Sequence, residues 1–100
     1  MEKNSSNSFE TADPVGLIDF IARSLVKHPD DVQVVSVPGP SSLIIELHVN
    51  HSDLGAIIGK GGRIAKSMRT LLNSISLKKI VVEENSDNKF NKIILEIIDQ

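Results

Sequence analysis

The first regular pattern of apolar residues starts at residue 13 and has the spacing of a helix. Asp13 is a good helix-capping residue, and Pro14 suits the first helical position, where its missing N–H costs nothing. The dipeptide His28-Pro29 ends the pattern, because proline disfavours helical geometry in the residue before it. We predict a helix between these points, with one buried stripe made of Leu17, Ile18, Ile21 and Leu25.

Two segments with the patterns of β-strands follow this helix. Residues 32–37 are rich in β-branched side chains and end at the turn sequence Pro38-Gly39-Pro40-Ser41. The next segment alternates between apolar and polar residues, which gives it one face toward a core. Its apolar residues are Leu43, Ile45, Leu47 and Val49, and its polar residues are Glu46, His48 and Asn50. We predict that the two strands form a hairpin.

The second half of the chain predicts two helices joined by glycines, and then a closing strand. Ser52 caps a short helix over residues 53–58, which leads directly into Gly59-Lys60-Gly61-Gly62. A longer helix starts at the last of these glycines and lasts to about Lys79. Its core stripe is Ile64, Met68, Leu71, Leu72 and Ile75. Residues 92–98 have the pattern of a strand.

The predicted order of elements is therefore α-β-β-α-α-β, an α+β fold in which a three-stranded sheet packs on helices. A chain of 100 residues has room for one small domain, which we place at residues 13–100. Residues 1–12 are rich in Asn and Ser and lack the apolar surface that would offset the entropy of ordering. We predict a disordered tail there.

Composition excludes several classes of protein. No apolar run approaches the roughly 20 residues that a membrane helix needs, and the amino terminus has no apolar segment typical of a secretory signal. The chain has no cysteine, which excludes disulfides and thiolate zinc sites. We expect a cytoplasmic protein.

Charge is distributed unevenly along the chain. The net charge is −2, yet no acidic residue occurs between Leu54 and Val82. That stretch holds six of the eleven Lys and Arg residues, namely Lys60, Arg63, Lys66, Arg69, Lys78 and Lys79. The basic stretch coincides with the glycine loop, and a local basic patch is the electrostatic mark of a nucleic-acid-binding surface.

The glycine loop has the features of a site for a phosphate group. A loop that opens a helix directs unpaired backbone N–H groups and the positive end of the helix dipole at one place. Glycine lets a phosphate approach the backbone and permits a turn with positive φ. Lys60 supplies a mobile charge at the tip, and Arg63 and Lys66 can follow adjacent phosphates. We expect the flanking apolar residues to form a floor for bases, and these are Ile57, Ile58 and Ile64.

These residues resemble the KH family, in which an Ile-Gly-x-x-Gly loop between two helices binds single-stranded RNA. The motif here is Ile57-Ile58-Gly59-Lys60-Gly61-Gly62-Arg63-Ile64. Because two strands precede the loop, the order resembles the prokaryotic, type II form. Further matches make the chain similar to the small bacterial KH proteins of the KhpA family: Asp13-Pro14, His28-Pro29, Asp53-Leu54-Gly55 and Arg69-Thr70-Leu71-Leu72.

The resemblance implies a cytoplasmic binder of single-stranded RNA, a family described as RNA chaperones. We expect no cofactor and no metal. The resemblance also implies a homodimer or a heteromeric complex with a larger KH protein of the KhpB or Jag type, and a link to cell length and cell-wall homeostasis. The RNA-binding residues that we predict are Ile57, Ile58, Gly59, Lys60, Gly61, Gly62, Arg63, Ile64 and Lys66. One departure is the stretch 80–91, which is longer than the family's connection between helix and strand.

The main alternative is a protein-interaction module that acts through homo- or heterodimerisation. The charged face of Lys60, Arg63 and Lys66 favours RNA, because the cores of protein interfaces are depleted in charge. Stacking-based recognition of RNA is not expected, since the chain has no Tyr or Trp and its Phe residues lie outside the loop.

Catalysis and metal binding are not indicated by the sequence. No nucleophile is paired with a base, and the loop lacks the GxxxxGK[ST] pattern of a nucleotide-hydrolysing P-loop, so we do not expect an enzyme. His48 and His51 have a spacing found in metal sites, but no third ligand lies nearby in the sequence.

Overall fold

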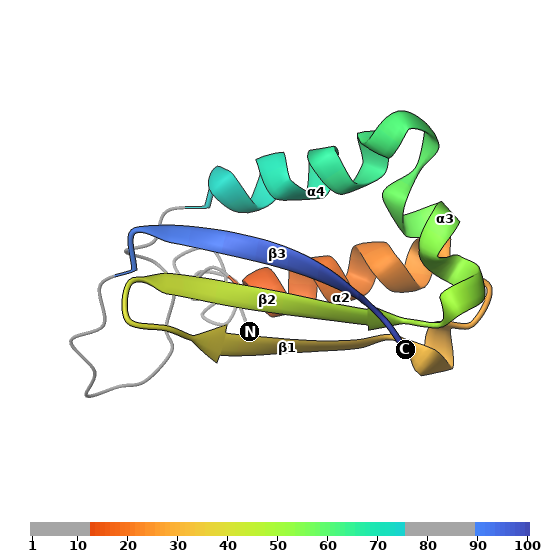
Figure 1. Cartoon of the computed structure of the whole chain (residues 1–100), viewed down its shortest axis with the longest axis horizontal. Coiled ribbons are helices and arrows are strands. Elements are labelled where there is room, and N and C mark those ends of the chain that lie inside the picture. The colour runs from red at the N-terminus through yellow and green to blue at the C-terminus, as the bar shows by residue number, and fades with distance from the viewer. Residues whose placement is uncertain (1–12, 76–89) are drawn as a thin grey trace, which may run out of the picture.

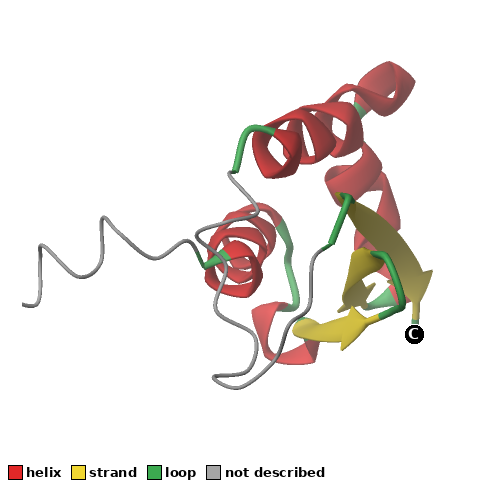
Figure 2. Cartoon of the chain, turned by 90° about the vertical axis from the view of Figure 1, so that its left-hand side faces the viewer, coloured by secondary structure: helices red, strands yellow, loops and turns green. Residues whose placement is uncertain are grey.

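The computed structural model describes residues 13–75 and 90–100, in which helices cover one face of a three-stranded sheet (Figure 1 and Figure 2). The elements follow the order α-β-β-α-α-β, as the sequence predicted. The predicted tail at residues 1–12 lies outside the described residues, as do Lys78 and Lys79 and most of the long connection at 80–91. No helix among the described residues is long and apolar enough to cross a membrane.

The sheet has its most apolar strand at its centre. Strand β1, Gln33–Pro38, pairs antiparallel with β2, Ser42–Val49, which confirms the hairpin, although β1 starts and ends one residue later than predicted. Strand β3, Lys92–Asp99, pairs parallel with the other side of β2, so β1 and β3 are both edge strands. The predicted alternation in β2 is confirmed, since its buried residues are Leu43, Ile45, Leu47 and Val49.

The helices pack on one face of this sheet and enclose the core. Helix α2, Pro14–Leu25, lies against β1 and β2, and helix α4, Arg63–Asn73, lies against β3. The short helix α3, Leu54–Ile58, precedes α4 and packs against it. The carboxylate of Asp13 accepts a hydrogen bond of 2.9 Å from the Gly16 N–H, which confirms the predicted cap. The core cluster is Ile18, Ala22, Val32, Leu43, Ile45, Leu47, Val49, Ile57, Met68, Leu72, Phe90, Ile93 and Leu95.

The first helix ends at Leu25, earlier than the predicted end at His28-Pro29. The backbone N–H groups of Lys27 and His28 do not continue the helix, because each donates to the carboxylate of Asp53 at 3.0 Å. A side chain that is distant in sequence therefore determines where this helix ends.

The long helix also ends earlier than predicted, at Asn73 instead of near Lys79. The hydroxyl of Ser74 donates to the Leu71 carbonyl at 2.7 Å. Such side-chain bonds to the backbone compete with the helical ladder and favour helix ends. The predicted end at Lys79 was wrong because Ser74 already supplies such a competing bond.

The apolar stripes of both long helices were also predicted with errors. Leu25 is 39% exposed and Leu71 is 45% exposed, so neither belongs to the core. Ala22 and Ala65 are buried instead, where a larger side chain would separate the helix from its neighbours. The other residues of the two predicted stripes are buried or half-buried, so the helix faces toward the core were predicted correctly.

Candidate nucleic-acid interface

The glycine loop joins α3 to α4 in a backbone geometry that Gly59 makes possible. Gly59 has φ 79° and ψ 170°, a region that residues with a side chain scarcely enter. A Cβ on this residue would lie 2.8 Å from the Cβ and 2.9 Å from the backbone nitrogen of Ile64. Ile64 therefore packs directly against Gly59, and this contact fixes the conformation of the loop.

The other two glycines of the loop leave its outer surface open. Gly61 and Gly62 also have positive φ, at 64° and 78°, but a Cβ on either would meet no atom within 4 Å. The N–H groups of Gly59 and Gly62 are bonded inside the loop, to the carbonyls of Gly55 and Gly59 at 2.8 and 3.1 Å. The N–H groups of Lys60 and Gly61 have no hydrogen-bond partner among the described residues. Two backbone donors are thus free at an exposed, unobstructed loop.

Basic side chains continue from this loop along α4. Arg63, Lys66 and Arg69 recur every third residue, so each is rotated by about 60° from the last on a helix of 3.6 residues per turn. Lys60 lies at the loop itself. In the part of the chain that the structure describes, none of these four side chains forms an ion pair. The positive charge therefore forms a continuous band that winds from the loop toward β3.

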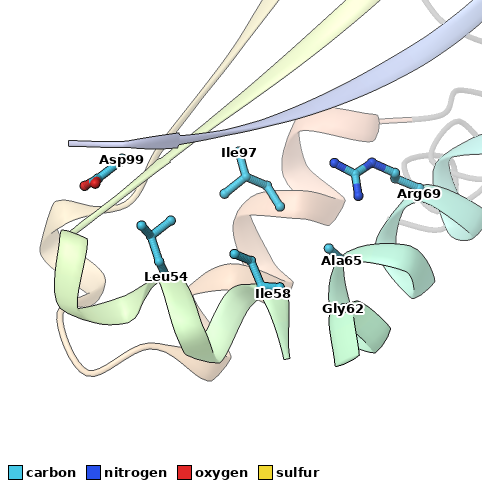
Figure 3. A pocket seen from close by; sticks show the side chains of 7 residues that line it. All are labelled: Leu54, Ile58, Gly62, Ala65, Arg69, Ile97 and Asp99. Atoms are coloured by element: carbon cyan, nitrogen blue, oxygen red, sulfur yellow. The ribbon is translucent and has the colours of Figure 1, made fainter. Parts of the chain in front are cut away.

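A groove of about 460 Å³ opens beside this band, between α3, α4 and the edge strand β3 (Figure 3). Its lining residues are Leu54, Ile58, Gly62, Ala65, Arg69, Ile97 and Asp99. Four of them are apolar side chains that form its floor, and Figure 3 shows these between the guanidinium of Arg69 at one end and the carboxylate of Asp99 at the other. The groove is thus apolar along its length and charged at its two ends.

Arg69 is held at its end of the groove by the backbone of β3. Its Nη2 donates to the Leu95 carbonyl at 3.4 Å. Because carbonyls two residues apart point to the same side of a strand, those of Ile97 and Asp99 also face this edge. β3 is an edge strand of the described sheet, so among residues 13–75 and 90–100 these backbone groups have no partner strand on the groove side.

Asp99 is held at the opposite end by His51. The His51 Nδ1 and the Asp99 Oδ2 are 2.7 Å apart. Asp99 remains 46% exposed, so its carboxylate is open to solvent as well as to the histidine.

A buried carboxylate fixes the start of α3 and hence the approach to the loop. Asp53 is buried, and it accepts hydrogen bonds from the backbone N–H groups of Lys27 and His28 and lies 3.1 Å from the His28 Nδ1. Burial by itself raises the pKa of Asp53, but these hydrogen bonds and the charge of His28 outweigh it and lower the pKa below its ordinary value. The ionised carboxylate therefore joins the end of α2 to the start of α3. The sequence analysis gave the cap to Ser52 and missed this role.

The structure places the predicted site residues in different environments. Lys60, Arg63 and Lys66 are exposed, and Ile58 is 40% exposed where it lines the groove. Ile57 is fully buried in the core and cannot form a floor for bases. The sequence analysis predicted this wrongly because adjacent isoleucines on a helix point in different directions.

Several groove residues were absent from the sequence analysis. Leu54 lies four residues before Ile58, a helical spacing that could have revealed it. Ile97 and Asp99 had no local signal, because only the parallel pairing of β3 brings them to this edge. Arg69 was not among the predicted RNA-binding residues, but it lines the groove.

The histidines considered as metal ligands each lie beside a carboxylate. The His48 Nε2 is 3.2 Å from the Glu46 Oε1, and His51 is paired with Asp99. Within the described ranges, no three His, Asp or Glu side chains gather as they would around a metal ion.

Comparison with known proteins gives a consistent result. A family model described as "KhpA/KhpB, KH domain" matches residues 16–80. The chain is similar to the RNA-binding protein KhpA of Clostridium perfringens, with 49% identity over 70 residues, which are 67% of this chain and 93% of that protein. It is also similar to the RNA-binding protein KhpA of Borreliella burgdorferi, with 45% identity over 69 residues, which are 69% of this chain and 84% of that protein. No solved structure matches the chain.

Proposed function

Because the chain belongs to the KhpA/KhpB family of KH domains, we propose that it binds single-stranded RNA and grips the sugar–phosphate backbone with its glycine loop. One observation carries the proposal most directly. Within the described residues, the N–H groups of Lys60 and Gly61 have no hydrogen-bond partner, and the cations that follow them form no ion pair. These donors and cations lie beside an apolar groove. Backbone donors and cations suit phosphates, whereas an apolar groove suits the faces of bases.

The proposed binding mode assigns a separate task to each part of the surface. Phosphates contact the loop N–H groups and the side chains of Lys60, Arg63 and Lys66, and Gly61 lets a phosphate approach closely. Bases lie on the groove floor, where the unpaired edge of β3 offers backbone groups to their polar edges. A KH groove accommodates about four nucleotides. We infer tight contact to the backbone and weaker selection among bases.

The decisive test replaces Lys60 and Gly61 together by aspartate. The two negative charges and the added side chains act where a phosphate is proposed to bind, so affinity for a labelled single-stranded RNA should fall steeply. A matched control with Lys60→Asn and Gly61→Asn has side chains of the same size and the same backbone strain without the negative charges. It should lose less affinity than the aspartate variant.

The loss of RNA affinity can be assigned to the loop only if the variants remain folded. A Cβ at residue 61 meets no other atom, and its positive φ adds strain of about 1–2 kcal/mol, so both variants should stay folded. If the folded aspartate variant binds RNA as well as the parent, the loop is not the RNA clamp.

A second candidate function is homo- or heterodimerisation, including pairing with a KhpB-type KH protein. The observation that favours it is Leu71, which is 45% exposed in a shallow depression formed with Lys66, Ser67 and Thr70. On a helix with 100° per residue, Leu71 lies about 160° from Arg69, so this surface and the groove are on opposite flanks of α4. Bases in the groove and a protein partner at Leu71 would then lie on different flanks of α4, with Lys66 between the two surfaces.

Sedimentation of the full chain tests this second function. Leu71→Asp places a charge in the exposed apolar depression and should dissociate a dimer. Asn73→Asp adds the same charge elsewhere on α4 and serves as the control. If the wild-type chain sediments as a monomer on its own and forms no complex when the KhpB-type partner is added, dimerisation is excluded.

The cellular role belongs to the same proposal. We infer a cytoplasmic RNA chaperone that influences cell length and cell-wall homeostasis, supported by the family resemblance. Complementation of a strain that lacks its own family member tests this role. Wild type should restore cell length, and the variant with aspartate at residues 60 and 61 should not. If both restore it, the cellular role does not depend on RNA binding at the loop.

A further inference from the structure

A carboxylate at the end of a groove proposed to bind a polyanion needs an explanation. Asp99 lines the groove at the end opposite Arg69 (Figure 3). An ionised carboxylate is only an acceptor of hydrogen bonds, and it repels phosphates. We propose that Asp99 selects the base at its end of the groove by accepting a hydrogen bond from an exocyclic amino group. This inference rests on the RNA-binding function proposed above.

The separation of the two charged ends means that they face different bases. Arg69 is bonded to Leu95, and Asp99 lies four residues further along the same strand. At about 3.3 Å per residue this is roughly 13 Å. Stacked bases are spaced by about 3.4 Å, so about four of them cover this span. The base beside Asp99 is therefore too far from Arg69 to be read by it.

The position of Asp99 leaves it available to a ligand. Its Oδ2 is engaged by His51 at 2.7 Å, and its Oδ1 has no hydrogen-bond partner among the described residues. The imidazole restricts the rotation of the carboxylate, so its direction is set before a ligand arrives. Ile97, two residues earlier on the same strand, also lines the groove.

The chemistry of the bases then decides which of them fits. Cytosine presents an amino group at N4, and adenine presents one at N6, and acidic side chains accept from such groups. Uracil has the carbonyl oxygen O4 where cytosine has its N4 amino group, so at that position an acceptor would face the acceptor oxygens of Asp99. The groove should therefore favour cytosine or adenine over uracil at this end.

The test compares two pyrimidine hexamers, oligo(C) and oligo(U), at one salt concentration. These hexamers have the same charge and nearly the same stacking area, so the comparison isolates the hydrogen-bonding groups at positions 3 and 4 of the base. Wild type should bind oligo(C) about five- to tenfold more tightly, the low end of the discrimination expected for one base contact. Asp99→Asn can donate as well as accept and should strengthen binding of oligo(U), which reduces the preference to about twofold or less.

Glu96→Gln is the matched control for this experiment. Glu96 lies on the same strand between Leu95, which is buried, and Ile97, which lines the groove, so it faces the other side of the sheet. The control removes the same charge and should keep the full preference for oligo(C). If Asp99→Asn keeps that preference too, Asp99 is only a structural partner of His51 and the inference is wrong.

The outcomes also separate this inference from the function on which it rests. Equal and measurable binding of both hexamers by wild type would overturn the base selection while leaving RNA binding intact. Binding of neither hexamer would refute RNA binding itself, and the base selection with it.

Discussion

Gly59→Ala should destabilise the fold far more than any other glycine substitution in the loop. The new methyl group would enter the space that Ile64 fills, 2.8 Å from its Cβ and 2.9 Å from its backbone nitrogen. A φ of 79° with ψ of 170° adds strain of about 1–3 kcal/mol. Overpacking against Ile64 adds about 1–3 kcal/mol. The expected total of about 4 kcal/mol is a large part of the roughly 5–15 kcal/mol by which a domain is stable.

Two other glycines supply controls for this prediction. Gly62→Ala meets no atom within 4 Å and carries only the strain of a φ of 78°, about 1–2 kcal/mol. Gly55→Ala lies inside α3 with open space around it and should stabilise the chain by about 0.5–1 kcal/mol. Urea denaturation followed by far-UV circular dichroism measures all three, because the chain has no Trp or Tyr for fluorescence. If Gly59→Ala loses no more stability than Gly62→Ala, the contact between Gly59 and Ile64 does not fix the conformation of the loop.

Two further predictions concern charge. The folded-state pKa of Asp53 is lowered, so its carboxylate contributes stability above the unfolded-state pKa of about 3.9, and this contribution is lost as pH falls through the lower folded-state pKa. As the pH is lowered below about 4, the free energy of unfolding should decrease more for wild type than for Asp53→Asn. If urea denaturation gives parallel curves of unfolding free energy against pH for the two proteins, this prediction is wrong. The logarithm of RNA affinity should fall with the logarithm of salt concentration with a slope of about −2 to −3, at about 0.7 per phosphate contact. Lys66→Gln should reduce the slope by about 0.7, whereas Lys92→Gln, on the sheet face away from the groove, should leave it unchanged, and an affinity independent of salt would exclude backbone binding.

Elements with a strong local pattern could be predicted from the sequence. The alternation in β2 is visible because one face is buried and the other is polar, and the register confirms it. The glycine loop was found because a tight turn between two helices restricts which residues can occupy it. Its role in binding RNA stays a prediction, but its conformation agrees with that interpretation, since all of its glycines have positive φ.

Helix ends and the groove were beyond the sequence pattern because distant residues determine them. Asp53 ends α2 through backbone groups that lie 25 and 26 residues earlier in the chain. In β3, isoleucines occupy both faces, so no alternation revealed which residues point to the helices. Only its parallel pairing with β2 places Ile97 and Asp99 beside α3 and α4. Pairing between strands so far apart in sequence leaves no local signal.

The net charge of −2 does not argue against an RNA partner, because charge acts over a limited range. At physiological salt the Debye length is about 8 Å, so exposed carboxylates beyond that distance are largely screened from the loop. Glu46 and Glu96 are cross-strand neighbours on the face of the sheet away from the helices. A sheet separates them from the groove, and sheet layers are about 10 Å apart. Asp99 lies inside the groove itself, so screening does not remove its repulsion. A base that donates to it must offset that repulsion, which is why Asp99 should affect base preference when Glu46 and Glu96 do not.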